Sequence, residues 1–217
     1  MGILVQYNKN WQNLYKKQAK QIKKAMGSKC AATYHIGATA IKDMPARPVI
    51  DILVILKDDL ATQDLISAGY QKKEDNVYAT TIEGQEFHIL CLNAENQDMI
   101  DAYLAMGQYL QSDKSIMQEF ITKKQGLATQ YEHDPQGYET AKKALFEELV
   151  PPAIAYKKKM EQQLFHMSIG MCIGCGIGAC FGFAIGNVGI GMCIGVAVGM
   201  CIGLVLGPVS QPKDENK

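Results

Sequence analysis

The stretch Val49-Ile-Asp51-Ile-Leu-Val-Ile-Leu56 gives the strongest strand signal in the chain. A run of branched aliphatic residues of this length is typical of a strand that other elements cover on both faces. One acidic residue, Asp51, interrupts the run. Because an unpaired carboxylate inside a protein is unfavourable, Asp51 needs a partner such as Arg47, Lys124, a metal ion or water.

The segments around this strand alternate between helical and extended patterns. Apolar residues recur at helical spacing over 10–26, and Glu83-Gly84 separates two extended runs. The predicted helices cover 10–26, 59–67, 98–110, 113–131, 136–149 and, after an interruption at Pro151-Pro152, 153–165; the predicted strands cover 30–35, 49–56, 77–82 and 86–92. Strands early and helices late indicate an α+β or small α/β domain.

Charge is distributed unevenly along the chain. The totals of 22 basic and 22 acidic residues give no net charge, which argues against a general nucleic-acid-binding protein. Residues 167–207 contain no Asp, Glu, Lys, Arg or His. The N-terminus lacks the apolar core of a signal peptide, and the seven cysteines do not form the framework of a small secreted domain. We therefore expect the part before the uncharged segment to be cytoplasmic, with reduced thiols.

The uncharged segment carries glycines four residues apart. The series shifts by one residue near Asn187, and its members are Gly170, Gly174, Gly178, Gly182 and Gly186, then Gly191, Gly195, Gly199, Gly203 and Gly207. This spacing puts glycines on one helical face, where two backbones approach closely in lipid. One helix over 167–207 would measure roughly 60 Å, about twice the thickness that ~20 residues span. The pattern therefore predicts a transmembrane hairpin of two helices, about 167–186 and 190–207.

The flanks of this hairpin predict its orientation. Lys157, Lys158 and Lys159 precede the first helix, and Lys213 and Lys217 follow the second. Because cytoplasmic flanks carry an excess of lysine, we expect both ends in the cytoplasm and lipid contact through 167–207. The glycine faces also offer a surface for a homo-oligomer. The alternative is a glycine-rich segment without fixed structure.

Several motifs together resemble the GrpB family. His35-Ile-Gly-Ala-Thr-Ala40, followed by Ala46-Arg-Pro-Val-Ile-Asp51-Ile-Leu-Val54, is similar to the family's signature. Supporting matches are Ser67-Ala-Gly-Tyr70, His88 within a strand, and Tyr138-Glu-Thr-Ala-Lys142. The resemblance covers residues 3–156 and implies a nucleotidyltransferase-like fold, a small mixed sheet with flanking helices.

The resemblance also implies a set of site residues. In the nucleotidyltransferase superfamily a glycine turn presents backbone N–H groups to a triphosphate, and carboxylates hold Mg²⁺ or Mn²⁺. In this chain Gly37 and Asp51 have the spacing of that turn and carboxylate, and Asp51 is the expected metal ligand. The GrpB-like motifs add His35 and His88, with Asp51, as catalytic groups, and Gly37, Thr39, Arg47, Tyr138 and Lys142 as ligand-binding groups. Lys124, a possible partner of Asp51, is a further ligand-binding candidate. We expect the three catalytic candidates to converge in one cleft.

Three positions depart from this pattern. The residue two after Asp51 is Leu53, so the second carboxylate of the superfamily is missing. Ala38 stands where the family has serine, and Met106-Gly-Gln108 stands where the family tends to show Phe-Arg-Asp. Together these departures weaken the case for nucleotidyl transfer and leave open whether the protein is an enzyme.

Three hypotheses on function follow. In the first, a GrpB-like domain (1–156) binds a nucleotide or other phosphorylated ligand, and a charged linker helix (157–166) joins it to the hairpin (167–207) and a polar tail (208–217). In the second, the domain is a non-catalytic interaction or folding-accessory module, and the hairpin assembles oligomers. In the third, the hairpins form a pore that the domain regulates.

Overall fold

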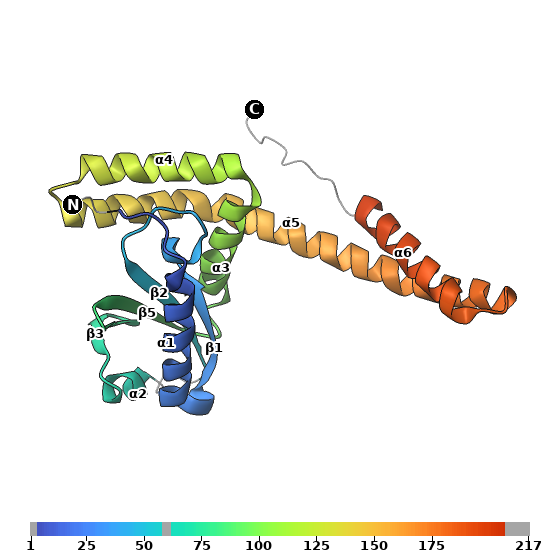
Figure 1. The fold of residues 1–217 in the computed structure, drawn as a ribbon, viewed down its shortest axis with the longest axis horizontal. Coiled ribbons are helices and arrows are strands. Elements are labelled where there is room, and N and C mark those ends of the chain that lie inside the picture. The colour runs from blue at the N-terminus through green and yellow to red at the C-terminus, as the bar shows by residue number, and fades with distance from the viewer. Residues whose placement is uncertain (1–3, 58–61, 207–217) are drawn as a thin grey trace. The chain divides into compact units, whose positions relative to one another are not determined.

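The computed structural model describes residues 4–57 and 62–206. The chain forms two compact units, Met1–Ile154 and Ala155–Lys217. Figure 1 shows strands and helices together in the first unit, whereas the described residues of the second form two helical stretches joined by a short turn.

The first unit is built on a five-stranded mixed sheet. The strands are β1 (Cys30–Ile36), β2 (Val49–Leu56), β3 (Gln71–Glu74), β4 (Val77–Ile82) and β5 (Gln85–Asn93). Their order is β1-β2-β5-β4-β3, with β2 parallel to β5 and the other neighbouring pairs antiparallel. The strand predicted over 49–56 is thus an interior strand, and the mixed α+β class is confirmed.

Strand β2 is covered on both faces, as its sequence predicts. One face buries Ile50 and Ile52 in a core shared with Trp11 of α1 (Asn10–Met26). The other face buries Leu53 together with Ile100 of α3 (Gln97–Ser112). Because side chains alternate along a strand, Asp51 shares the face of Leu53.

The remaining helices are α2 (Thr62–Ser67), α4 (Lys114–Gln130), α5 (Pro135–Ala184) and α6 (Val188–Leu206). Helices α3 and α4 and the beginning of α5 enclose a third core, which contains Met44, Leu110, Phe120 and Phe146. Residues 59–61 of the helix predicted over 59–67 lie outside the described residues.

The predicted break at Pro151-Pro152 is wrong. Helix α5 runs from Pro135 to Ala184 with both prolines inside it. A proline in a helix normally destabilises it, because the carbonyl four residues earlier loses its N–H partner. Here the residues four positions earlier, Glu147 and Glu148, are exposed, so water can bond those carbonyl groups.

Strand β3 is absent from the predicted strands. Its residues, Gln71–Glu74, are polar and all exposed, so no alternation or β-branched run marks them. They are extended because they pair with β4 at the edge of the sheet. Pairing with a neighbour, rather than local sequence, determines this strand.

The second unit contains a helical hairpin. Helix α5 ends at Ala184, α6 begins at Val188, and Gly186 between them has a φ of +75°. Asn187 caps α6, since its side-chain oxygen accepts a hydrogen bond from the N–H of Ile190 at 3.2 Å. The chain therefore reverses between the two predicted spans.

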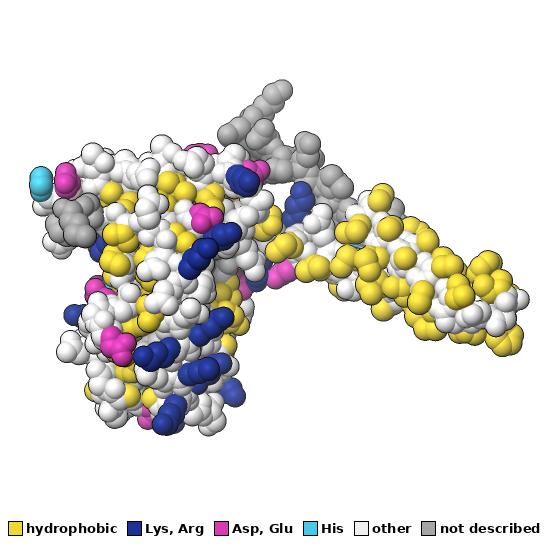
Figure 2. Space-filling view, viewed as in Figure 1, with side chains coloured by type: hydrophobic (Ala, Val, Ile, Leu, Met, Phe, Trp, Pro, Cys, Tyr) yellow, Lys and Arg dark blue, Asp and Glu magenta, His cyan; other side chains and the backbone are white. Residues whose placement is uncertain are grey.

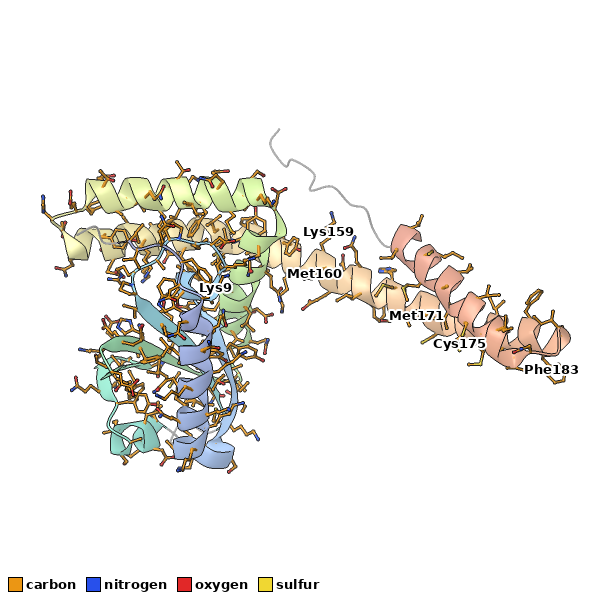
Figure 3. The ribbon with its side chains drawn as sticks, in the orientation of Figure 1. Lys9, Lys159, Met160, Met171, Cys175 and Phe183 are labelled. Carbon is orange, nitrogen blue, oxygen red and sulfur yellow. The ribbon has the colours of Figure 1, made fainter. Side chains whose placement is uncertain are left out.

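Glycines bring the two helices of this hairpin into backbone contact. An added Cβ would lie closer than 3.0 Å to backbone atoms of the facing helix at Gly170, Gly174, Gly178, Gly191, Gly195 and Gly199. Side chains larger than hydrogen are therefore excluded from this seam. The larger apolar side chains lie elsewhere on the hairpin, and Phe183, labelled near its turn in Figure 3, is 81% exposed.

The outer surface of the hairpin is apolar, as the yellow side chains in Figure 2 show. Exposed members include Ile173, Ile177, Phe181 and Val205. By length and composition, α5 and α6 each contain a stretch that could cross a membrane, with mean hydropathies of 1.7 and 2.4.

Candidate functional site

A small cavity of about 50 Å³ lies in the first unit, where residues at the ends of β1 and β2 meet residues of α4 and α5. Its lining consists of Gly37, Ala38, Thr39, Ala46, Arg47, Val49, Asp51, Lys124, Tyr138 and Lys142. Seven of the nine residues predicted for the site therefore line one cavity. His35 and His88 do not belong to this lining.

Gly37 ends β1 and leaves room for Asp51. Its φ of +72° and ψ of −173° belong to a region that glycine alone occupies readily. A Cβ on Gly37 would lie 2.5 Å from Oδ2 of Asp51. The turn therefore requires glycine both for its backbone conformation and for the close approach of the carboxylate.

Asp51 lies in an environment that opposes its ionisation. Burial raises the pKa of the carboxyl, whereas Lys142, His88 and Arg47 act in the opposite direction. The side chain still keeps 34% of its surface accessible and takes part in the cavity lining. Asp51 therefore combines access to a ligand with a raised tendency to hold a proton.

Glu139 connects two of the cations at the cavity. Its Oε1 lies 2.8 Å from Nη1 of Arg47, and its Oε2 lies 3.6 Å from Nζ of Lys142. Both cations are partly exposed, at 32% and 46% of their side-chain surface. One carboxylate thus interacts with both of the partly exposed cations of the cavity lining.

Lys124 is the buried cation of the site. It is 5% exposed, and its Nζ donates a hydrogen bond to the carbonyl oxygen of Pro45 at 2.7 Å. Burial, followed by the nearby charge of Lys142, lowers the pKa of Lys124 to about 7, although Asp51 acts in the opposite direction. An amine that titrates near neutral pH beside a cavity is a candidate functional group.

Parallel pairing places His88 beside Asp51. The two residues are directly opposite in the register of β2 and β5, so they share a face. Nδ1 of His88 lies 3.8 Å from Oδ1 of Asp51, and its Nε2 lies 2.9 Å from Oε1 of Glu86. His88 therefore connects the carboxyl group in the cavity with an exposed carboxylate outside it.

The expected convergence of His35 with Asp51 is wrong. In the antiparallel pairing of β1 and β2, His35 lies opposite Ile52, and Ile36 lies opposite Asp51. Residues opposite each other share a face, so His35 points to the other side of the sheet. There its ring stacks on Tyr15, with ring centroids 4.9 Å apart.

His35 nevertheless acts on the cavity through Thr39. Its Nε2 lies 3.0 Å from Oγ1 of Thr39, and its buried Nδ1 has no hydrogen-bond partner among the described residues. Burial lowers the pKa of His35 to about 4, so the ring is neutral at neutral pH. Because a buried N–H without an acceptor is less favourable than a bare ring nitrogen, we infer that Nε2 donates to Thr39. The Thr39 hydroxyl is then left to donate its own hydrogen elsewhere.

Two acidic residues that take part in the site were absent from the prediction. Glu139 lies three positions before Lys142, one helical turn away, so this pairing was readable from the spacing. Its contact with Arg47 joins distant parts of the sequence, so the spacing of residues could not predict that contact. Glu86 is two residues from His88 on the same strand face, which local alternation indicates.

The residues present do not form a metal site by themselves. The described part of the chain contains no group of three or more His, Cys, Asp or Glu side chains that could hold a metal ion. Asp51 is the single carboxylate in the cavity lining, which also contains three cations. Since Mg²⁺ commonly combines one or two carboxylates with phosphate oxygens and water, a metal here would depend on a bound phosphate.

The fold matches that of a solved structure. The crystal structure of the conserved protein GrpB from Enterococcus faecalis is similar to this chain with a TM-score of 0.62. The match covers 71% of this chain and 99% of that one, at 22% sequence identity. Both chains therefore share the mixed sheet with flanking helices.

Sequence comparison establishes the family. A family model described as GrpB protein matches residues 3–151. Glutamate-rich protein GrpB of Alkalihalophilus pseudofirmus is 30% identical over 162 residues, which cover 68% of this chain and 93% of that protein. A UPF0157 protein of Halalkalibacterium halodurans is 28% identical over 160 residues, which cover 70% and 82%. The chain belongs to the GrpB family, and the resemblance of its motifs is confirmed over residues 3–151.

Proposed function

We propose that the GrpB domain of this chain binds a phosphate group of a small molecule, such as a nucleotide, in the cavity beside Asp51. The observation that carries this proposal is the presence of three cations, Arg47, Lys124 and Lys142, in the lining of one small cavity. The cavity is small, about 50 Å³, so a whole nucleotide does not fit inside it. A single phosphate group is thus the suitable occupant, with the rest of the ligand outside.

Five polar residues of the cavity have distinct parts in this proposal. The planar guanidinium of Arg47 suits two phosphate oxygens at once, whereas Lys142 and Lys124 act as point charges. Thr39 donates its hydroxyl hydrogen. A bound anion would raise the pKa of Asp51 further, so that the carboxyl group is protonated and donates a hydrogen bond as well.

The proposal concerns binding and not nucleotidyl transfer. Leu53, at the position of the superfamily's second carboxylate, is fully buried in an apolar core. The cations already present can neutralise a phosphate without a metal ion. The effect of added Mg²⁺ or Mn²⁺ on binding is therefore measured separately.

We also propose that α5 and α6 attach the domain to a membrane. Lipid would cover the exposed apolar side chains of the hairpin, and helical backbone satisfies its own hydrogen bonds there. The glycine seam supplies the close packing that small residues allow between helices in lipid. Because the glycine rows face each other within one chain, neither a glycine-mediated oligomer nor a pore is part of this proposal.

Thermal unfolding of the full chain in detergent tests the phosphate site. Pyrophosphate, ATP or inorganic phosphate is titrated without divalent metal, and sodium chloride at equal ionic strength serves as a salt control. A ligand at about 100 times its Kd stabilises a protein by about 2.7 kcal/mol, which is easily measured. Lys142→Ala should abolish the shift. Lys143→Ala removes a neighbouring exposed lysine outside the cavity lining and should retain it.

Two outcomes contradict the proposal. Equal shifts in Lys142→Ala and Lys143→Ala would mean that the anion binds elsewhere on the protein. A shift that appears only after addition of Mg²⁺ or Mn²⁺ would replace the cation-based site with a metal-dependent one. Loss of that metal-dependent shift in Asp51→Asn would then identify Asp51 as the metal ligand.

A further inference from the structure

Helix α1 has two opposite faces of different character. Its buried residues, Trp11, Gln18, Ala19, Ile22 and Met26, face the core. At 100° per residue, the five lysines of the helix fall within an arc of about 120° on the opposite side. These are Lys16, Lys17, Lys20, Lys23 and Lys24, all exposed, and they are called the lysine face of α1.

The lysine face belongs to the most strongly charged region of the chain. Residues 1–42 contain eight lysines and no Asp or Glu, although the whole chain is neutral. Figure 2 shows dark blue side chains grouped over α1, and Figure 3 places Lys9 at the N-terminal end of the helix. The chain is therefore neutral in total but cationic on this surface.

Neighbouring acidic residues neutralise little of this charge. Within the lysine face, Lys17 lies 3.5 Å from Glu83, while the other four lysines form no ion pair with a described residue. Lys16 and Lys20, and Lys20 and Lys24, are four residues apart, a spacing at which like charges repel each other. The arrangement disfavours the isolated helix, and an anionic partner would relieve the repulsion.

We propose that the lysine face of α1 binds the anionic headgroups of a lipid bilayer. Lysine clusters near a membrane are attracted to anionic lipids through their charge alone. Nucleic-acid readers rely more on arginine and on stacking aromatic rings, and the lysine face contains neither. The inference rests on the proposed membrane attachment, because the attachment makes a lipid headgroup layer the anionic surface nearest to the domain.

Lysine reactivity in the full chain tests this inference. The protein is reconstituted in nanodiscs of phosphatidylcholine alone or with phosphatidylserine, and an amine-acetylating reagent is followed by mass spectrometry. Acetylation of Lys16, Lys20 and Lys24 should be roughly fivefold slower in the discs with phosphatidylserine, and about 1 M salt should remove the difference. Lys72, Lys73 and Lys143 are exposed internal standards whose rates should stay constant.

A matched pair of variants checks the assignment. Lys16→Gln, Lys20→Gln and Lys24→Gln together should abolish the effect of phosphatidylserine on the remaining α1 lysines. Glutamine is a good helix former, so the helix should persist and circular dichroism should be unchanged. The control variant changes two lysines of β3 instead, Lys72→Gln and Lys73→Gln. In this control, phosphatidylserine should still slow the acetylation of the α1 lysines.

The outcomes separate failure of this inference from failure of the membrane attachment. If the chain enters the discs but its α1 lysines react equally in both, the lysine face does not bind lipid. Protection by added RNA in phosphatidylcholine discs, without protection by phosphatidylserine, would make nucleic acid the partner instead. If the chain stays outside the discs, the proposed membrane attachment is wrong. Acetylation of the α1 lysines is then compared with added vesicles that contain or lack phosphatidylserine, which still shows whether the lysine face binds anionic lipid.

Discussion

Gly37 lies so close to Asp51 that a Cβ on the glycine would approach Oδ2 to 2.5 Å. We predict that Gly37→Ala displaces the carboxyl group and abolishes phosphate binding. Gly84→Ala is the matched control, since Gly84 also has a positive φ, +78°, but open space around it. Urea unfolding should show a loss of about 1–3 kcal/mol for the control and a larger loss for Gly37→Ala. Equal losses would mean that contact with Asp51 is unimportant.

Glu139 competes with an anion for Arg47 and Lys142, so its removal should strengthen binding. We predict that Glu139→Gln lowers the Kd for pyrophosphate by about two- to fivefold, in line with the 0.2–1 kcal/mol of an exposed ion pair. Isothermal titration calorimetry measures the change. Glu148 lies on the same helix as Glu139 and pairs with Lys123. Glu148→Gln should therefore leave the Kd unchanged. Weaker binding in Glu139→Gln would show that Glu139 organises the cations instead.

Lys124 should make both stability and binding depend on pH. Its pKa is lowered from 10.5 to about 7, so folding disfavours its protonated form. The resulting destabilisation is complete below pH 7 and disappears as the pH rises from about 7 to 10.5. Lys124→Met removes this contribution together with the hydrogen bond to Pro45, which adds a constant offset. The stability of Lys124→Met relative to wild type should therefore fall between about pH 6 and pH 9, as measured by urea unfolding.

The same titration predicts how ligand binding responds to pH. A bound phosphate favours the protonated amine, so the wild type should lose phosphate affinity relative to Lys124→Met as the pH rises above about 7, since both proteins meet the same ionisation of the ligand. Asp51, which an anion also drives toward protonation, acts in the same direction. Binding by Lys124→Met should vary less with pH over this range. An identical pH profile in the variant would exclude Lys124 as the titrating group.

The glycine seam of the hairpin allows a comparison within one helix. Gly174 faces the backbone of Gly195, whereas Gly176, half a turn away, has nothing within 4 Å of an added Cβ. We predict that Gly174→Leu separates α5 and α6 and that Gly176→Leu does not. Spin labels on Cys172 and Cys201, with the other tail cysteines replaced, should report a longer distance in Gly174→Leu alone. Equal distances in both variants would mean that the glycines do not determine the packing.

The proposed membrane hairpin has a topology that chemical labelling can examine. In a chain without its native tail cysteines, Asn187→Cys should react with a membrane-impermeant maleimide added to intact cells. Lys159→Cys should react only after the membrane is opened, because both ends are predicted to be cytoplasmic. If Asn187→Cys also requires opening of the membrane, the hairpin does not expose its turn on the outer side.

Much of the fold could be predicted because burial leaves a strong pattern in the sequence. The strand at Val49–Leu56 and the helix at Asn10–Met26 have the predicted bounds, since both carry apolar residues at the spacing of their element. Polar β3 has no such pattern and depends on its partner β4. Pro151 and Pro152 are strong local signals for a break, yet α5 continues through them, and the residues four positions earlier, Glu147 and Glu148, are exposed.

The site was predicted less completely because it depends on strand register. Family motifs identified six residues that do line the cavity, including Lys142, and the need of Asp51 for a partner identified a seventh, Lys124, on another helix. They could not identify the face of His35, because a shift of one residue in the pairing of β1 with β2 moves every side chain to the opposite face. The packing of whole strands determines the register, so a short motif does not predict it.

Strand β3 also bears on the colloidal behaviour of the protein. The last strand of an open sheet has unpaired backbone groups that can recruit a strand from another molecule, which is a common route to aggregation. Here that strand carries Lys72, Lys73 and Glu74, all exposed. Pairing with an identical strand would bring these charges together in poorly hydrated surroundings, so the sheet resists polymerisation at this edge.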